Sequence, residues 1–152
     1  MNGRGLLRNT CVALLLLTTA HAGPRADQIG VDGIYAGTIG MQLATDKGKN
    51  MDYKAAAKLV VMPDGTGAIL TAQHPEGVVS LALKGEFKGN VFFAESRGRQ
   101  DYGGYTQGMK WDISFDMKKG TATMHGKAIN LPKWAKDDDY RYTFRKQATK
   151  RR

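Results

Sequence analysis

Residues 109–117 read MKWDISFDM, and this stretch decides the fold class. Apolar side chains occupy its odd positions, whereas lysine, aspartate and serine occupy its even positions. Successive side chains of a β-strand point to opposite faces of a sheet, so the alternation predicts a strand with one dry face and one wet face. The dry face packs either against the protein's own core or against a ligand, and the sequence leaves that choice open.

Short alternating runs of the same kind recur on both sides of this strand, separated by Gly, Pro, Asn and Asp, and no long stretch has helical periodicity. Pro63-Asp64-Gly65 predicts a turn, because Pro fixes φ, Asp bonds to nearby backbone and Gly accepts positive φ. The predicted strands are 33–43, 55–62, 66–72, 78–87, 91–95, 107–117, 121–129 and 140–146, and the long loops are 44–54, 96–106 and 130–139.

Eight consecutive strands joined mostly by tight turns predict an all-β, antiparallel up-and-down barrel over residues 33–146. Pairing of the first strand with the last would remove the exposed sheet edges, and a two-sheet β-sandwich is the alternative. An outer-membrane barrel does not fit, because such barrels carry apolar residues outside, whereas strands 107–117 and 140–146 each have a charged face.

The barrel pattern is similar to that of the calycin group, which comprises the lipocalins and their relatives. The similarity rests on Gly33-Ile34-Tyr35 at the start of the first strand, the eight-strand meander, and the basic, aromatic last strand. Lipocalins open with a Gly-x-Trp near the barrel floor, and an Arg of the last strand packs over that Trp. The resemblance implies that Tyr35 replaces the Trp and that Arg141 or Arg145 replaces the Arg. The family's paired cysteines and its helix before the last strand have no clear counterpart here.

The N-terminus predicts export. Arg4 and Arg8 form a basic head, a short apolar stretch follows, and AHA at 20–22 presents the small residues of a signal-peptidase site. The apolar stretch is about half of the ~20 residues that span a bilayer, so we expect cleavage after Ala22 rather than an anchor. We therefore expect a periplasmic or extracellular protein of the kind found in a bacterial envelope. Its parts are a signal peptide (1–22), an N-terminal arm (23–32), the barrel domain (33–146) and a basic tail (147–152).

Composition limits the chemistry of the mature chain. The single cysteine, Cys11, lies in the expected signal, which excludes disulfides, thiol catalysis and cysteine-based zinc sites. His74 and His125 lack metal-ligand spacing, and no Gly-x-Ser-x-Gly motif occurs. Asp112 and Asp116 share the wet face of strand 107–117, where we expect solvated surface rather than a catalytic acid pair. We predict no metal, no cofactor and no enzymatic activity.

The basic balance of the chain predicts anionic partners. Lys and Arg total 23 against 14 Asp and Glu, which gives a formal net charge of +9. Such an excess attracts anionic partners, of which an envelope component is one. We expect neither sequence-specific nucleic-acid binding nor a transmembrane segment in the mature chain.

The predicted interior mixes large apolar side chains with Gly and Ala. Small residues opposite large ones make a solid core, whereas small residues beside Met and Tyr line a cavity. A ligand in such a cavity would be apolar or amphipathic, because the inward positions carry no charge. The candidate ligand-binding residues are Tyr35, Met109, Trp111, Phe115 and Tyr142.

The long loops supply a second set of candidates. In a meander the loops 44–54, 96–106 and 130–139 fall at one end of the barrel, which predicts an open mouth there. Cations and aromatics at this end suit contacts with anionic or planar partners. The candidate rim or partner-contact residues are Arg97, Arg99, Tyr102, Tyr105 and Trp134. The first functional hypothesis is an exported, non-catalytic binding protein for a small lipophilic ligand. The alternative is a solid barrel that acts through its basic surface and loops as an envelope-associated interaction or inhibitor protein.

Overall fold

The computed structural model describes residues 23–44, 50–102, 105–129 and 140–148, and of residues 42–44, 50, 97–102 and 105–107 only the backbone. The expected signal peptide and Trp134 lie outside the described residues. Within the described ranges, no helix has the length and apolar character needed to cross a bilayer.

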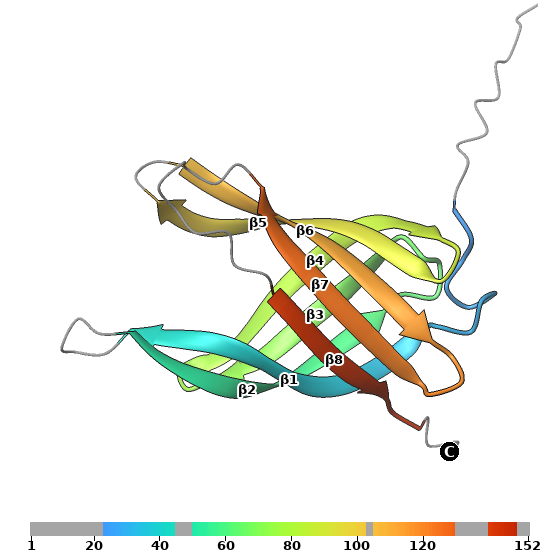
Figure 1. The fold of residues 1–152 in the computed structure, drawn as a ribbon, viewed down its shortest axis with the longest axis horizontal. Helices are drawn as coiled ribbons and strands as arrows, with labels where there is room; N and C mark the ends of the chain where they lie inside the picture. The colour runs from blue at the N-terminus through green and yellow to red at the C-terminus, as the bar shows by residue number, and fades with distance from the viewer. Residues whose placement is uncertain (1–22, 45–49, 103–104, 130–139, 149–152) are drawn as a thin grey trace, which may run out of the picture.

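The chain forms a closed antiparallel barrel of eight strands in the neighbour order β1-β2-β3-β4-β5-β6-β7-β8 (Figure 1). This confirms the predicted all-β, up-and-down barrel and leaves no role for the alternative β-sandwich. The strands are β1 (Gly33–Ala44), β2 (Asn50–Val61), β3 (Gly67–His74), β4 (Gly77–Lys88), β5 (Val91–Tyr102), β6 (Tyr105–Asp116), β7 (Thr121–Ile129) and β8 (Tyr140–Lys146).

Two of the predicted long loops are wrong, because most of their residues belong to strands. β1 and β2 pair as far as Ala44–Asn50, and β5 and β6 pair as far as Tyr102–Tyr105, with a register shift between Arg97 and Asp101. Residues 96–106 are rich in Gly and polar residues and lack the apolar alternation used to find strands, whereas Met51 and Tyr53 continue the alternation of β2 but follow a polar stretch. Backbone pairing with the neighbouring strand extends both segments into hairpins.

Met117 was predicted to continue the dry face of strand 107–117, and this prediction is wrong. β6 ends at Asp116, and Met117 lies in the following turn with 62% of its surface exposed. Asp116 ends the strand locally, because its carboxylate accepts hydrogen bonds from the backbone N–H groups of Lys118 and Lys119, each at 3.1 Å. An Asp that binds the backbone two residues ahead favours a turn over a continued strand.

Two of the strand pairs that close the barrel, β4–β5 and β1–β8, are paired over short stretches only, which we call seams. β4 and β5 pair over five residues, from Lys84–Glu95 to Lys88–Val91, and β1 and β8 pair over only three, from Tyr35–Lys146 to Gly37–Phe144. Both seams lie toward the turns that join β2 to β3, β4 to β5 and β6 to β7. Beyond them the sheet continues as two halves, β1–β4 and β5–β8, whose β1–β2 and β5–β6 hairpins project at the opposite end (Figure 1). The barrel therefore has a closed end and an open end, and we call the open end the mouth.

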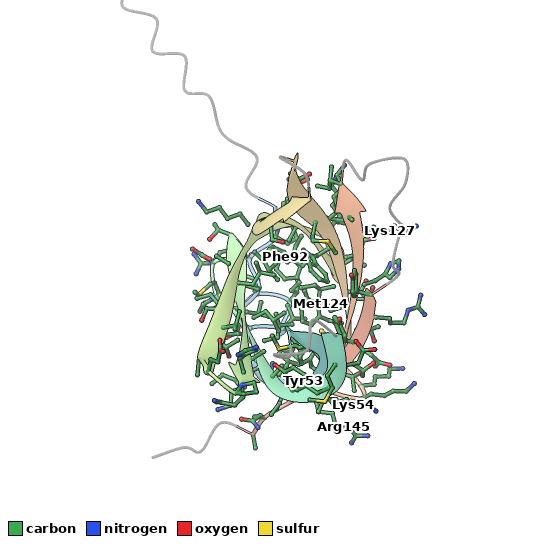
Figure 2. All side chains as sticks on the ribbon, turned by 90° about the vertical axis from the view of Figure 1, so that its left-hand side faces the viewer. Tyr53, Lys54, Phe92, Met124, Lys127 and Arg145 are labelled. Atoms are coloured by element: carbon green, nitrogen blue, oxygen red, sulfur yellow. The ribbon has the colours of Figure 1, made fainter. Side chains whose placement is uncertain are left out.

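The closed half of the barrel is filled with side chains. Leu59, Ile113, Met124 and Phe144 have no exposed surface. Figure 2, which looks at the barrel from the hairpin side, shows Phe92 and Met124 within the ring of strands. The prediction of a solid core is therefore confirmed for this half of the barrel.

Two glycines show how the large and small residues fit. Gly37 pairs with Phe144, and a Cβ at Gly37 would lie 2.8 Å from the Phe144 ring and 2.6 Å from the Thr143 carbonyl oxygen. Gly126 pairs with Trp111, and a Cβ there would collide with the indole ring. Each glycine is thus covered by an aromatic ring of its cross-strand neighbour rather than lining an empty space.

We expect Gly37→Ala to lower the free energy of unfolding by about 1–3 kcal/mol, because the added methyl must displace both a ring and a backbone carbonyl at the closing seam. The matched control is Gly40→Ala on the same strand, since no atom lies within 4 Å of a Cβ there. Urea unfolding should show a change within about ±0.5 kcal/mol for the control. Equal stability of the two variants would contradict this account of the seam.

Candidate functional site

Side chains at the mouth follow the inward alternation of their strands but become progressively exposed. On β4, Leu83 is buried, Leu81 is half-buried and Val79 is 47% exposed. Met51 on β2 and Tyr140 on β8 continue the inward positions of their strands and are 52% and 36% exposed. The mouth therefore presents apolar and aromatic side chains above the filled half.

On the β1–β4 side, Tyr53 organises the mouth. It pairs with Met41, and its hydroxyl donates a hydrogen bond to the Met41 sulfur at 3.6 Å. Its ring also meets the His74 ring edge to face, with 6.1 Å between centroids. His74 is fixed in turn, because its Nδ1 accepts the Glu76 backbone N–H at 3.2 Å. Tyr53 was predicted to lie in a loop, although it continues the inward positions that Ala55 and the later odd-numbered residues of β2 occupy.

On the β5–β8 side, two of the predicted ligand-binding residues lie at the mouth. Met109 and Tyr142 are half-buried against the core. Burial raises the pKa of the Tyr142 hydroxyl, and Tyr140 adds a smaller upward contribution. Tyr142 therefore stays neutral well above physiological pH and offers an uncharged polar tip.

Trp111, the third of these residues, lies deeper and is held in place by a polar contact. Its indole N–H donates a 2.8 Å hydrogen bond to the Ser96 hydroxyl, and both side chains are buried. Ser96 is the buried polar residue of the described chain, and sequence reasoning missed it because it lay in a predicted loop. The contact fixes the ring over Gly126 and thereby fixes one wall of the mouth.

We expect Ser96→Ala to lower the free energy of unfolding by about 1–3 kcal/mol, because the buried indole N–H loses its acceptor. Ser114→Ala, at an exposed position of β6, is the control and should be neutral. In a Trp134→Phe background, the emission of Trp111 should change with the first substitution only. Unchanged stability and emission in Ser96→Ala would show that the hydrogen bond does not hold the ring.

The remaining two predicted ligand-binding residues, Tyr35 and Phe115, lie on the floor of the closed half. Their rings meet edge to face at 5.5 Å, and Phe87 packs against Phe115 at 5.8 Å. The Tyr35 hydroxyl donates a 2.9 Å hydrogen bond to the Val31 carbonyl, which ties the N-terminal arm beneath the barrel. The structure thus separates the five predicted residues into a packed floor and an open mouth.

The cation over Tyr35 is not the one expected from the lipocalin resemblance. Lys146 places its ammonium 5.8 Å from the Tyr35 ring centroid and donates a 2.8 Å hydrogen bond to the Gly30 carbonyl. The register pairs Tyr35 with Lys146, whereas Arg141 and Arg145 alternate with the inward Tyr142 and Phe144 and are exposed. The implied role of Arg141 or Arg145 is therefore wrong.

Burial, with a smaller contribution from Asp32, raises the pKa of Tyr35 from 10.0 to about 12. The Tyr35 hydroxyl therefore loses its proton at a lower pH in the unfolded chain than in the folded one. Its contribution to the free energy of unfolding is fully present below pH 10 and is lost as the pH rises to about 12. We expect unfolding free energies measured across this window to fall more steeply for the wild type than for Tyr35→Phe. Parallel pH profiles would contradict this assignment.

The predicted rim residues are only partly placed. Arg97, Arg99 and Tyr102 belong to β5 and Tyr105 to β6, so all four lie on the projecting hairpin, where the structure describes their backbone. Trp134 lies outside the described residues. The hairpin position agrees with the predicted end of the barrel, although the loop itself is mostly strand.

Charges on the outer surface are unevenly distributed. On β4–β6, Lys88 lies 3.2 Å from Glu86 and Lys110 lies 4.0 Å from Glu95. The outward positions of β7, β8, β1 and β2 carry one described acid, Asp52, and five Lys or Arg side chains, and Figure 2 shows three of these five pointing away from the barrel. The five are Lys54, Lys58, Lys127, Arg141 and Arg145.

No cluster of three or more His, Cys, Asp or Glu side chains suited to a metal ion occurs among the described residues. Comparison of the chain with protein-family models, curated proteins and solved structures found no match.

Proposed function

We propose that this chain is an exported, non-catalytic binding protein that holds a small apolar or amphipathic ligand at the mouth of its barrel. The observation that carries the proposal is the gradient of exposure along the inward positions. Leu83 is buried, Leu81 half-buried and Val79 exposed, while the chemistry stays apolar throughout. Continuous apolar surface that rises from a packed core to an opening suits an apolar ligand.

Two tyrosines are among the described polar side chains of the mouth, and they define the ligand further. The Tyr53 hydroxyl lies beside the Met41 sulfur, and Tyr142 and Met109 are each partly buried against the core. Methionine adapts its shape to different apolar partners, and a tyrosine hydroxyl can orient one polar end. The ligand therefore occupies the upper half of the barrel, since Tyr35 and Phe115 fill the floor.

The barrel topology is compatible with the lipocalin resemblance, and a cation of the last strand over an aromatic residue of the first supports it. The basic head, apolar stretch and small residues of the first 22 positions support export. On this proposal the ligand is carried or sequestered outside the cytoplasm without chemical change.

A second candidate function rests on the segregated charges of the outer surface. The cations of β7, β8, β1 and β2 form a basic face, while lysines of β4–β6 have acidic neighbours. Through this face the barrel would bind an anionic envelope component. Such binding would weaken strongly on adding salt, whereas uptake of a neutral ligand would not.

The mouth proposal predicts saturable binding of the uncharged dye N-phenyl-1-naphthylamine, with little dependence on salt. Met109→Glu should weaken that binding by about tenfold or more, because a carboxylate would have to lose water beside the dye. Fluorescence titration measures the affinity, and a thermal melt confirms that the variant is folded.

The matched control is Met117→Glu, which makes the same charge change in an exposed turn at the closed end. It should leave dye binding unchanged. Failure of the wild type to bind the dye, or equal loss in both variants, would reject the mouth as an apolar site. Salt-sensitive retention on an anionic matrix without dye uptake would favour the second candidate.

A further inference from the structure

The seam between β4 and β5 opens into a fork. Pairing of the two strands stops at Lys84–Glu95, although β4 continues back to Gly77 and β5 continues forward to Tyr102. Beyond this point β4 pairs with β3 and β5 with β6, and no described strand pairs with the facing edges. In Figure 1 the β5–β6 hairpin rises away from β4 at this end of the barrel.

The backbone direction at the fork follows from one hydrogen bond. The Gly85 N–H donates to the Thr66 carbonyl at 3.3 Å, so it points toward the β3 side. Backbone groups alternate in direction along a strand, so the N–H and C=O groups of Ala82 and Ser80 point the opposite way, into the fork. These groups have no strand partner among the described residues.

A cleft of about 1380 Å³ lies at this fork. Its lining includes Ser80 and Ala82 of the β4 edge, so the unpaired backbone groups border the space directly. Leu81 and Trp111 contribute apolar surface, while Lys84 and Glu95 bring opposite charges to its outer side. The cleft therefore combines a backbone edge, an apolar wall and a charged rim.

Gly85 lies one pair before the fork. A Cβ at this position would collide with the Phe93 carbonyl oxygen of β5, so the two backbones approach closely there, and their pairing ends at the next pair, Lys84–Glu95. Close approach of two backbones is a recurrent reason for glycine within a strand. Gly85 thus marks the last close approach of the two backbones before they separate.

The β4 edge also lacks the usual protection against added strands. Natural edges carry charged residues, proline or bulges that prevent pairing with other chains. Residues 77–83 read GVVSLAL and contain neither a charge nor proline, and Val78 is 65% exposed. An apolar, unprotected edge beside a cleft is suited to accept another strand.

We propose that the fork is a strand-addition site for an extended polypeptide segment whose apolar and polar residues alternate. A peptide backbone offers donors and acceptors at the spacing that Ser80 and Ala82 require, which a small apolar molecule does not. Apolar side chains of the segment would face Leu81 and Trp111, and polar ones would face Lys84 and Glu95. The edge is recessed in a cleft, which one extended chain enters more readily than the edge of a second folded barrel.

The test uses the mature full-length protein and the peptide acetyl-Lys-Thr-Val-Thr-Val-Thr-Lys-amide. Without peptide, the amides of Ser80 and Ala82 should exchange hydrogen faster than those of Leu81 and Leu83, whose N–H groups point toward β3. Saturating peptide should slow exchange at Ser80 and Ala82 by about tenfold or more, as new backbone hydrogen bonds form. The same peptide with its central amides N-methylated is the control and should give no protection.

A variant pair tests the geometry from the side of the protein. Ala82→Pro removes one N–H from the fork but none from the β3 pairing, and proline is tolerated where a strand's N–H faces outward. It should abolish peptide binding, whereas Ala82→Val keeps the N–H and should bind. If Ala82→Pro does not fold, the comparison of the two peptides on the wild type still decides the question.

Three results would overturn the proposal. Equal protection by the N-methylated peptide would mean that only side chains bind. Full affinity in a folded Ala82→Pro variant would mean that the edge is not used. Protection without peptide that rises with protein concentration would identify a second copy, rather than a peptide, as the occupant. Each of these results can be obtained whether or not the mouth binds the dye, so the two proposals fail independently.

Discussion

Closure of the barrel depends on three residue pairs between its first and last strands, Tyr35–Lys146, Ala36–Arg145 and Gly37–Phe144. The absence of a side chain at Gly37 lets the Phe144 ring lie against the β1 backbone, which brings the strands together and fills the space between them. A longer seam would close the barrel along its whole length. Because this seam is short, β1 and β8 are free of one another toward the hairpins, and an open end follows directly from the way the barrel closes.

The closed end supports the open one. Aromatic rings of Tyr35, Phe87 and Phe115 pack on the floor, and the N-terminal arm is tied there by the Tyr35 hydroxyl and by Lys146. The single cysteine of the chain, Cys11, precedes the described residues, so no disulfide links them. Packing and hydrogen bonding therefore hold the described barrel together. Close-packed protein interiors resist deformation, so this floor can hold the half-sheets above it, whose inward side chains are partly exposed.

Alternation, together with the residues of tight turns, predicted the barrel and found β7 and β8 at their observed bounds, because each of these strands has one face on the core. The prediction ended the strands too early at residues 50–54, although Met51 and Tyr53 continue the alternation, and at residues 96–102, where Gly and polar residues replace it. Alternation also predicted Trp111 and Tyr142 as inward residues but not their different depths. How deeply a side chain is buried depends on the register of all strands around the barrel. The same register places Lys146, rather than Arg141 or Arg145, beside Tyr35. A single strand pattern contains no information about register between the first and last strands.

The two proposed sites use different chemistry but share a wall. At the mouth, side chains such as Met109 and Tyr142 offer apolar surface, whereas at the fork the backbone of Ser80 and Ala82 offers hydrogen bonds. Leu81 and Trp111 belong to both, since they point inward on their strands and also line the cleft. A ligand in one site therefore changes the surroundings of Leu81 and Trp111, which also form part of the other site. Any resulting change in affinity must be the same in both directions, because the coupling free energy between two binding sites is reciprocal. The hydrogen bond from Trp111 to Ser96 lies at this shared wall and holds the indole ring that borders both proposed sites.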